Sequence, residues 1–274
     1  MADKRPSRKA RERSDAPPSG EALARYYDLD LESEPLDLDM YLAFAAAAGG
    51  TVLELMAGTG RIAVPLAMAG HRVTAVDNDP FMLARAATRW QRTSAGARKG
   101  GALDLVEADV TRLKLGKRFD LVIVALNGLL LLDRAAQTQT LECITHHLKP
   151  NGRVVIDVWL PQPDDLALYD GRLMLDWTRI DAETGQRVAK TTAARYEAAA
   201  RTARISTFFD AWNEGESPAR TSRRDTVNFL NQDELERLAD DAGLVVNTLA
   251  GDYEMGHFGI DSDRLVMVCS RQTR

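Results

Sequence analysis

The sequence predicts an α/β fold, in which helices flank a mostly parallel sheet of seven strands and an antiparallel β-meander follows the fifth strand. Two patterns predict it. Between residues 51 and 160, short apolar runs alternate with helical stretches, as in the βαβ units of a parallel sheet. Between residues 172 and 230, turn residues interrupt a strand-like alternation, which is typical of antiparallel hairpins.

The most informative part of the core is the segment 52–61, with the sequence VLELMAGTGR. It has the pattern of a buried strand that passes through a glycine turn into a helix. Gly58 and Gly60 can adopt positive φ, and they let a ligand approach the backbone without a Cβ in the way. The first turn of the helix offers free N–H groups to negative charge. This segment therefore predicts a site for a nucleotide-type cofactor.

An acid in this strand indicates which cofactor the site takes. Glu54 stands near the carboxyl end of the strand, where it would repel a pyrophosphate and attract an ammonium or sulfonium group. Ala63 can pass as the third small residue of a dinucleotide motif. The carboxylate nevertheless favours S-adenosylmethionine over NAD.

Acids also end the next two strands. The second strand, 71–77, ends at Asp77, which can accept hydrogen bonds from both hydroxyls of a ribose. A helix then begins, with Asp79 as N-cap and Pro80 at the first position. The third strand, 103–109, ends at Asp109.

The remaining elements complete both predicted sheets. The core continues with a strand at 119–125, a helix at 135–148 and a turn and strand within 148–157. The meander strands are expected at 173–180, 187–196, 204–212 and 220–229. The last helix starts at a capping box of Asn231 and Glu234 and ends at Gly243, and strands at 244–250 and 265–270 follow.

In these motifs the chain resembles the class I, Rossmann-like methyltransferases that use S-adenosylmethionine, of the small-molecule type. The resemblance covers residues 40–160 closely and the C-terminal part more loosely. One departure is Met56, where many members carry glycine. The matching motifs are ELMAGTG at 54–60, VDNDP at 76–80, EAD at 107–109, FDLV at 119–122 and LKPNG at 148–152.

The resemblance implies roles for residues around the cofactor. It places Glu54 near the methionine amino group, Asp77 on the ribose diol and Asp109 on the adenine amino group. Phe81 and Met82 can flank the adenine or can simply pack in the core. The expected cofactor-binding residues are Glu54, Ala57, Gly58, Gly60, Arg61, Asp77, Asn78, Met82, Asp109, Val110 and Tyr26.

Three residues are candidates for catalysis: Asn127, His257 and Tyr27. Asn127 follows the fourth strand, either near the transferring methyl group or as an ordinary turn residue. His257, between the last two strands, is a general base or a surface residue. Tyr26 and Tyr27 belong to a segment that covers the active site in similar enzymes, or that only packs on the sheet. Arg61 is unfavourable at a helix start, so it is a candidate to reach the cofactor carboxylate.

The sequence divides into five regions. Residues 1–19, rich in Arg, Lys, Ser and Pro, are expected to form a disordered tail. A stretch from Asp28 to Asp39 carries six carboxylates and is expected to be a solvated linker. The other regions are a helical lid segment (20–50), the cofactor-binding core (51–160), an insert that caps the acceptor site and can mediate a homodimer (161–230), and the final helix and strands (231–274).

Composition excludes several classes of protein. The net charge of −5 offers no electrostatic case for binding nucleic acid. No apolar run approaches the ~20 residues of a membrane span, and no signal peptide is visible. Cys143 and Cys269 have neither metal-ligand spacing nor a disulfide context, so we expect reduced thiols, no metal site and a cytoplasmic protein.

The expected activity is methyl transfer to a small-molecule acceptor. N-methylation is slightly favoured, because oxygen nucleophiles usually need a strong base and the sequence shows no clear base or metal cluster. Looser features, among them the loop that includes Tyr253, resemble amino-sugar and glycine N-methyltransferases. Five insert arginines can clamp an anionic substrate or pair with acids: Arg195, Arg204, Arg220, Arg223 and Arg224.

Two alternatives remain open. A nucleic-acid methyltransferase is disfavoured by the acidic charge and by the sequence ALNG at 125–128, where such enzymes carry an Asn-Pro-Pro-Tyr type motif. A non-catalytic S-adenosylmethionine-binding or scaffold protein is the other alternative.

Overall fold

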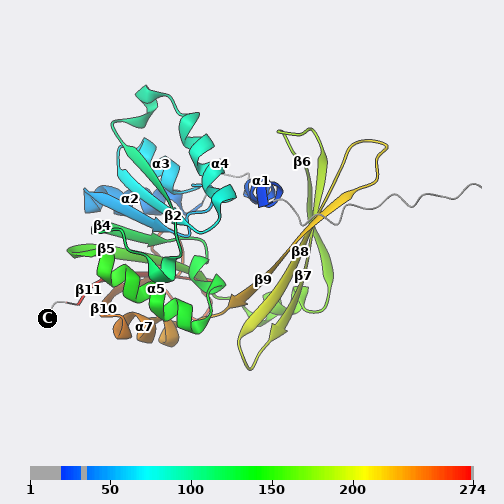
Figure 1. The fold of residues 1–274 in the computed structure, drawn as a ribbon. Coiled ribbons are helices and arrows are strands. Elements are labelled where there is room, and N and C mark those ends of the chain that lie inside the picture. Colours follow the sequence, from blue (N-terminus) through cyan, green and yellow to red (C-terminus); the bar gives the residue numbers. More distant parts are fainter. Residues whose placement is uncertain (1–19, 32–35, 273–274) are drawn as a thin grey trace, which may run out of the picture.

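A computed structural model of the chain describes residues 20–31 and 36–272, so the predicted tail at 1–19 lies outside the described residues. The chain forms two sheets, which stand side by side with the helix α1 (Gly20–Asp30) between them (Figure 1). The larger sheet belongs to the core and the smaller sheet is the insert.

The core sheet has seven strands in the order β10-β11-β5-β4-β1-β2-β3, which confirms the predicted fold class. All neighbouring strands run parallel except β11, which is antiparallel to both β5 and β10. The turn predicted ahead of the strand within 148–157 is instead a register shift inside β5. The strands are β1 (Thr51–Leu55), β2 (Arg72–Asp77), β3 (Ala102–Glu107), β4 (Phe119–Val124), β5 (Leu148–Trp159), β10 (Leu244–Ala250) and β11 (Arg264–Arg271).

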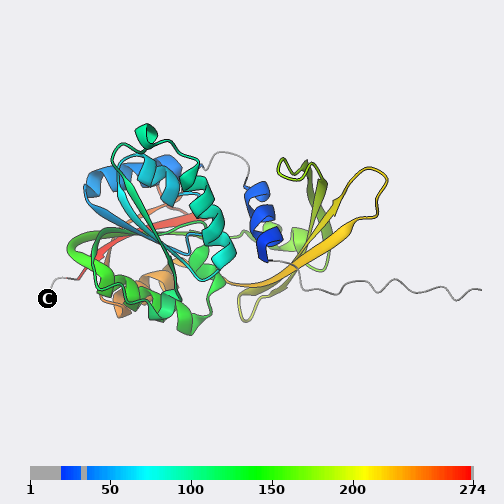
Figure 2. The same cartoon turned by 45° about the horizontal axis from the view of Figure 1, so that its top comes forward.

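Helices cover both faces of this sheet (Figure 2). Side chains of α2 and α3 belong to the apolar cluster on one face, and those of α5 and α7 to the cluster on the other. The helices of the core are α2 (Leu38–Ala48), α3 (Ala63–Met68), α4 (Pro80–Gln91), α5 (Arg134–His147) and α7 (Gln232–Asp241). Three 3-10 turns join them: η1 (Ala95–Arg98), η2 (Val110–Arg112) and η3 (Gly128–Leu131).

The predicted helix caps are confirmed. Asp79 accepts a hydrogen bond from the backbone N–H of Phe81 over 2.8 Å at the start of α4. Asn231 and Glu234 form the reciprocal capping box before α7. Gly243, with φ of 78°, follows the end of α7 in the left-handed conformation that glycine adopts without strain.

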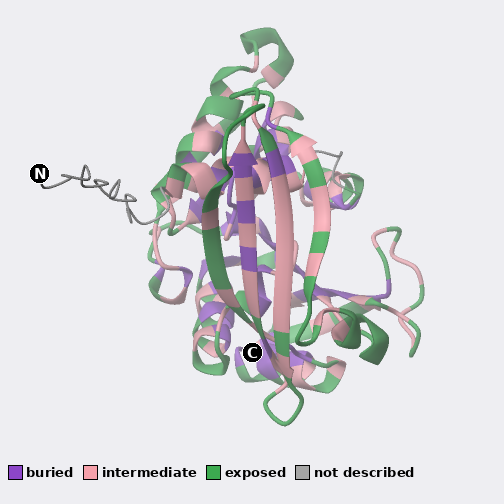
Figure 3. Ribbon diagram, turned by 90° about the vertical axis from the view of Figure 1, so that its right-hand side faces the viewer, coloured by how far each residue is buried: buried purple, intermediate pink, exposed green. Residues whose placement is uncertain are grey.

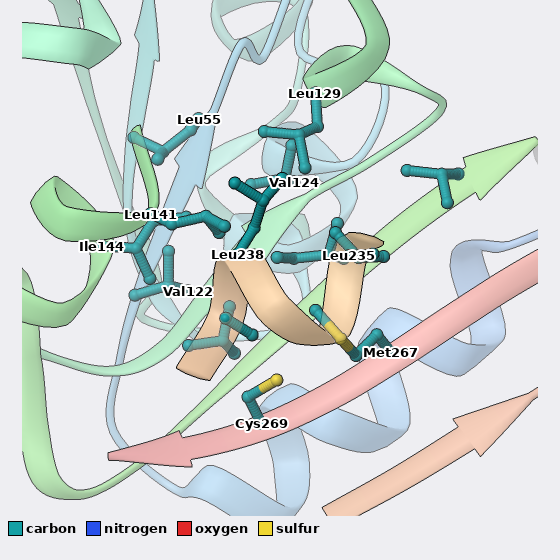
Figure 4. Close-up of a cluster of buried hydrophobic side chains, with 14 of the residues drawn as sticks. Leu55, Val122, Val124, Leu129, Leu141, Ile144, Leu235, Leu238, Met267 and Cys269 are labelled. Atoms are coloured by element: carbon teal, nitrogen blue, oxygen red, sulfur yellow. The ribbon is translucent and has the colours of Figure 1, made fainter. Parts of the chain in front are cut away.

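The apolar core surrounds the central strands. Leu55, Val122 and Val124 are buried in the cluster that α5 and α7 cover (Figure 4). Each fully buried aliphatic side chain of this kind contributes about 1.5–3 kcal/mol. Because parallel strands are covered on both faces, β4 reads as an almost continuous apolar run.

The insert confirms the predicted meander. Its four antiparallel strands lie in sequence order, β6 (Leu173–Ile180), β7 (Arg187–Glu197), β8 (Thr202–Trp212) and β9 (Ala219–Asn228). A short helix, α6 (Pro163–Tyr169), precedes them. The sheet forms one side of the molecule, and most of its residues are exposed or half-buried (Figure 3).

The prediction of a solvated linker between Asp28 and Asp39 is wrong for three of its acids. Asp37 is buried, while Asp28 forms ion pairs with α4 and Asp30 with β7. Sequence spacing does not reveal these contacts, because their basic partners come from distant elements.

The described residues were also compared with the predictions on membrane spans, metal sites and cysteines. No helix in residues 20–31 and 36–272 is long and apolar enough to cross a membrane. The same residues include no group of three or more His, Cys, Asp or Glu side chains arranged to hold a metal ion. Cys143 is half-buried and Cys269 is buried, and both are free thiols.

Candidate active site

The glycine turn joins β1 to α3 at the carboxyl edge of the core sheet. Gly58 and Gly60 have φ of 54° and 74°. A Cβ on Gly60 would lie 3.0 Å from the side chains of Val64 and Ala86, so α4 packs closely against this turn. Positive φ and close packing together explain why glycine stands at these positions.

Asp77, at the end of β2, anchors the glycine turn. Its Oδ2 accepts a hydrogen bond from the N–H of Gly58 over 2.7 Å, and its Oδ1 accepts one from the N–H of Asp79 over 2.9 Å. Burial raises the pKa of this carboxyl group, against the effect of the backbone hydrogen bonds. Each oxygen keeps acceptor capacity, as the predicted contact with two ribose hydroxyls requires.

Glu54 is a buried acid without a complete set of partners. Its side chain is 3 % exposed, and its Oε2 has no hydrogen-bond partner among the described residues. Burial raises the pKa of this carboxyl group to about 8, although the charge of Arg61 lowers it. An unpaired buried acceptor beside the glycine turn fits the cationic amino group of a cofactor.

Arg61 does not point a free guanidinium at the glycine turn. Its Nη1 and Nη2 donate to the two carboxylate oxygens of Asp37 over 2.5 and 2.7 Å, and both side chains are largely buried. The proposed contact of Arg61 with the cofactor carboxylate therefore has to share this guanidinium with Asp37. Sequence reasoning missed Asp37, because nothing local distinguishes it from its acidic neighbours.

The two tyrosines of α1 face different partners. The Tyr27 ring lies 3.6–3.8 Å from the position that a Cβ on Gly58 would occupy. Burial raises the pKa of Tyr27, with a lowering effect of Arg61 and a raising effect of Glu54. Tyr26 instead stacks on Phe209 of the insert, with ring centroids 4.9 Å apart. The structure thus brings Tyr27 to the glycine turn and places Tyr26 in the contact between α1 and the insert.

Asp109 lies beyond β3, which ends two residues earlier than predicted. Its Oδ1 accepts hydrogen bonds from the N–H and the hydroxyl of Thr111, and its Oδ2 accepts from Arg112. The bonds from Thr111 and then Arg112 hold the pKa of Asp109 at about 2. An adenine amino group would share an acceptor that already caps η2.

The other residues predicted around the adenine differ in exposure. Val110 is buried, Met82 is half-buried and Asn78 is exposed. Phe81 is 45 % exposed, and a Cβ on Gly20 would collide with its ring. The start of α1 therefore packs directly on Phe81.

The turn after β4 is strained. Leu126 and Asn127 have φ of 45° and 65°, and Met56 across from them has φ of 57°. Left-handed backbone costs a non-glycine residue roughly 1–2 kcal/mol. The Met56 side chain lies 3.3–3.4 Å from where a Cβ on Gly128 would stand, so packing against this turn holds Met56 in place. The position where relatives carry glycine thus keeps a glycine-like backbone.

Hydrogen bonds join this strained turn to the end of β5. The Asn127 Oδ1 accepts from the N–H of Trp159 over 2.6 Å, and Asp157 accepts from the N–H of Leu126 over 3.1 Å. Asp157 is fully buried and pairs with Arg264. The sequence carried a signal for Asp157 that we did not use, an acid near the end of a buried strand.

His257 lies apart from these groups. It is exposed in the loop between β10 and β11, and its main chain bridges to Ala250. The two interpretations of His257, general base and surface residue, both stay predictions, and its exposure favours the second.

A cavity of about 320 Å³ lies between the insert and the core, and we call it the inner cavity. The core contributes Leu131 of η3 and Trp159 of β5. The insert contributes polar side chains, including Asp176, Arg223 and Asp225. Because Trp159 binds Asn127, the cavity adjoins the turn at the end of β4.

Residues 52–152 match the family described as a methyltransferase domain, and this segment contains the glycine turn, Asp77 and Asp109. The protein is an S-adenosylmethionine-dependent methyltransferase. Glu54 and the glycine turn fit this cofactor, since the site combines an unpaired buried acid with positive-φ backbone. A comparison with curated proteins found no match to the sequence.

Solved methyltransferase structures share the whole fold, the insert included. A methyltransferase from Clostridium acetobutylicum is 16 % identical, covers 93 % of this chain and 99 % of its own, and has a TM-score of 0.74. The CcbJ methyltransferase from Streptomyces caelestis is 25 % identical, with coverages of 88 % and 97 % and a TM-score of 0.69. The sugar N-methyltransferase KedS8 from Streptoalloteichus is 18 % identical, with coverages of 100 % and 99 % and a TM-score of 0.70.

Proposed function

We propose that this methyltransferase transfers the methyl group to the nitrogen of a small amine held in the inner cavity. The cavity itself carries the proposal. Its volume of about 320 Å³ lies at the lower end of the range for small-molecule sites, about 300–1,000 Å³. A single substituted ring fits this space.

The chemistry of the lining supports a polar ring that carries an amine. The Asp176 carboxylate accepts hydrogen bonds from the hydroxyls of Thr192 and Tyr169, and Lys190 lies 3.4 Å away. Asp225 pairs with Arg223 over 2.7 Å. Carboxylates and hydroxyls suit an amino group and ring hydroxyls, and Trp159 adds an aromatic face.

One hydrogen bond and one electrostatic interaction support transfer from the cofactor site into this cavity. Asn127, predicted near the transferring methyl group, binds the backbone of Trp159 in the cavity wall. Burial raises the pKa of Tyr27, whose ring packs by Gly58, and the charge of Arg223 in the cavity lining acts against this rise. We infer that Tyr27 faces the acceptor.

The cofactor supplies an electrophilic methyl group on a sulfonium sulfur. The chain's own contribution is to hold the acceptor nitrogen in line and to exclude water. Positioning of this kind can supply about 7–11 kcal/mol of a reaction barrier. A neutral amine needs no strong base, which is why we propose N- over O-methylation. KedS8, described as a sugar N-methyltransferase, has the same overall fold and adds support for a sugar-like amine.

A transfer assay tests this function. The purified protein is incubated with S-adenosylmethionine labelled in the methyl group and with two matched panels, amino sugars and the corresponding hydroxy sugars. We expect label in the amino sugars only, and none with the Asp77→Ala variant. Label that reaches only RNA or protein would contradict the small-molecule proposal, and tight cofactor binding without any transfer would favour the scaffold alternative.

Assembly and location stay predictions. The face of the insert opposite the inner cavity is the surface we propose for a homodimer, and light scattering of the purified protein measures its mass directly. A monomer at micromolar concentration would contradict that proposal. The cytoplasmic location expected from the sequence also stays a prediction.

A further inference from the structure

A second cavity, about 560 Å³ in volume, adjoins the inner cavity at the base of the insert. We call it the outer cavity. The two cavities share three lining residues, Leu166, Tyr196 and Phe229. The Phe229 ring packs edge-on against Trp159 and Tyr196, with centroids 5.7 and 6.1 Å apart. Aromatic side chains therefore form the common boundary at which the two cavities meet.

The surface that the outer cavity leaves for a ligand is apolar. Leu160 follows β5, Leu230 precedes α7, and Phe258 and Ile260 come from the β10–β11 loop. Ile260 is 93 % exposed, so its side chain is open to a ligand at this site.

The polar groups of the outer cavity are already engaged within the protein. Arg201 forms an ion pair with Glu234, so its charge is compensated. Asn231 belongs to the capping box of α7 and Gln162 to that of α6. Among the described lining residues, no charged group is left unpaired. The outer cavity therefore suits a neutral occupant.

We propose that the outer cavity is a second acceptor subsite, which binds a neutral, apolar, ring-sized substituent attached to the ring that is methylated. This inference rests on the proposed function of the inner cavity. The natural acceptor is then a two-part molecule, with its polar amino ring among the carboxylates and hydroxyls and its apolar part among Leu160, Leu230 and Phe258. The substituent is attached on the side of the ring that faces Phe229.

Two probes separate the subsites. Glucosamine represents the amino ring alone, and 4-nitrophenyl 2-amino-2-deoxy-β-D-glucopyranoside adds a neutral aromatic ring. Calorimetry measures the affinity of each probe for the full chain with S-adenosylhomocysteine present. We expect the glycoside to bind at least tenfold more tightly than glucosamine.

Matched variants assign this gain to the outer cavity. Gly259 lines the cavity, has ordinary φ and leaves room for a Cβ, so Gly259→Trp fills the space. Gly96, in η1 at the far edge of the core, accepts the same change in open space and serves as the control. We expect Gly259→Trp to remove the tenfold gain of the glycoside with glucosamine unaffected, and Gly96→Trp to leave both affinities unchanged.

A second pair guards against misfolding of the first variant. Ile260→Asp places a charge at a 93 % exposed position of the outer cavity, and Ile180→Asp does so at a 63 % exposed position of the insert. Only the first should weaken glycoside binding. Equal affinity for the two probes, including no binding of either, or a gain that survives both cavity variants, would overturn the proposal. Methyl transfer to the amine panel without any such gain leaves the proposed function intact, so the two ideas fail separately.

Discussion

Arg61 and Asp37 form a two-point ion pair, in which Nη1 and Nη2 of the arginine meet both oxygens of the carboxylate over 2.5 and 2.7 Å. Only 11 % of the arginine side chain and 2 % of the aspartate side chain are exposed. The pair ties the segment before α2 to the glycine turn of the cofactor site. It also brings a positive charge near Glu54, where it lowers the pKa that burial raises.

Breaking this pair from one side should destabilise the fold. Asp37→Asn leaves a buried guanidinium without a counter-charge, and such a loss costs about 3–5 kcal/mol. Urea denaturation measures the change in the free energy of unfolding. The control is Asp104→Asn, whose partner Lys117 is 48 % exposed, and exposed pairs contribute about 0–1 kcal/mol. Equal losses in both variants would show that burial does not strengthen the Asp37 pair.

Glu54 should make stability depend on pH. Burial raises its folded pKa to about 8 from 4.5, so the folded state holds a proton that the unfolded state has released between these values. Stability therefore falls as pH rises from about 4.5 to 8. Glu54→Gln removes this pH dependence of stability. The melting temperature of the variant, compared with that of the parent at the same pH, should therefore rise between pH 5 and pH 8.5. Glu107→Gln, at the exposed end of β3, controls for the lost charge. If the difference in melting temperature between Glu54→Gln and the parent did not change with pH, the raised pKa of Glu54 would be contradicted.

Asp77 should control cofactor affinity. A hydrogen bond to a charged group contributes about 1.5–3 kcal/mol, so losing both ribose contacts predicts a cost of about 3 kcal/mol or more. Asp77→Ala should therefore weaken S-adenosylmethionine binding beyond about 100-fold, as measured by calorimetry. Asp104→Ala, an exposed acid on the neighbouring strand β3, should bind as the parent does. Unchanged affinity of Asp77→Ala would refute the ribose assignment, and a melting curve without ligand checks its folding.

The strain at Met56 can be isolated by comparing two variants. Met56→Ala removes the side chain but keeps a non-glycine residue at φ of 57°, whereas Met56→Gly removes both. We expect the glycine variant to be the more stable by about 1 kcal/mol, because left-handed backbone disfavours alanine. At exposed Ala84 in α4, alanine should be more stable than glycine, as is usual in a helix. Ala84→Gly should therefore lower the free energy of unfolding by about 1 kcal/mol. If alanine were more stable than glycine at position 56 as well, the backbone at Met56 would have left the left-handed conformation in the alanine variant. Denaturant titration supplies all four free energies of unfolding.

Tyr27 and His257 can be compared as candidate catalytic groups. Tyr27→Phe keeps the ring beside Gly58 and removes only the hydroxyl, so cofactor affinity should stay within about twofold. If the hydroxyl orients the acceptor, kcat/KM for the amine should fall at least tenfold, about 1.4 kcal/mol. His257→Ala should keep full activity, because the imidazole is exposed outside the inner cavity. A tenfold loss in His257→Ala at neutral pH would restore it as the general base.

The features predicted correctly from the sequence are those that depend on residues close together in the chain. Asp79 and Pro80 start α4 through bonds that span a few residues. Gly58 and Gly60 mark the turn because their φ values suit glycine. The apolar runs of the core strands follow from burial on both faces of a parallel sheet. Local propensity and periodicity therefore specified the two sheets and the glycine turn at which a ligand is expected.

Relationships between distant segments were decided only in the folded molecule. The sequence marked Arg61 and Asp37 as charged residues 24 positions apart, but packing made them a buried pair. It showed Tyr26 and Tyr27 as neighbours, and the placement of α1 sent one ring to Phe209 and the other to Gly58. The cavities depend on how the insert docks on the core. Long-range packing has no local pattern in the chain, because each contact joins residues that neither spacing nor composition relates.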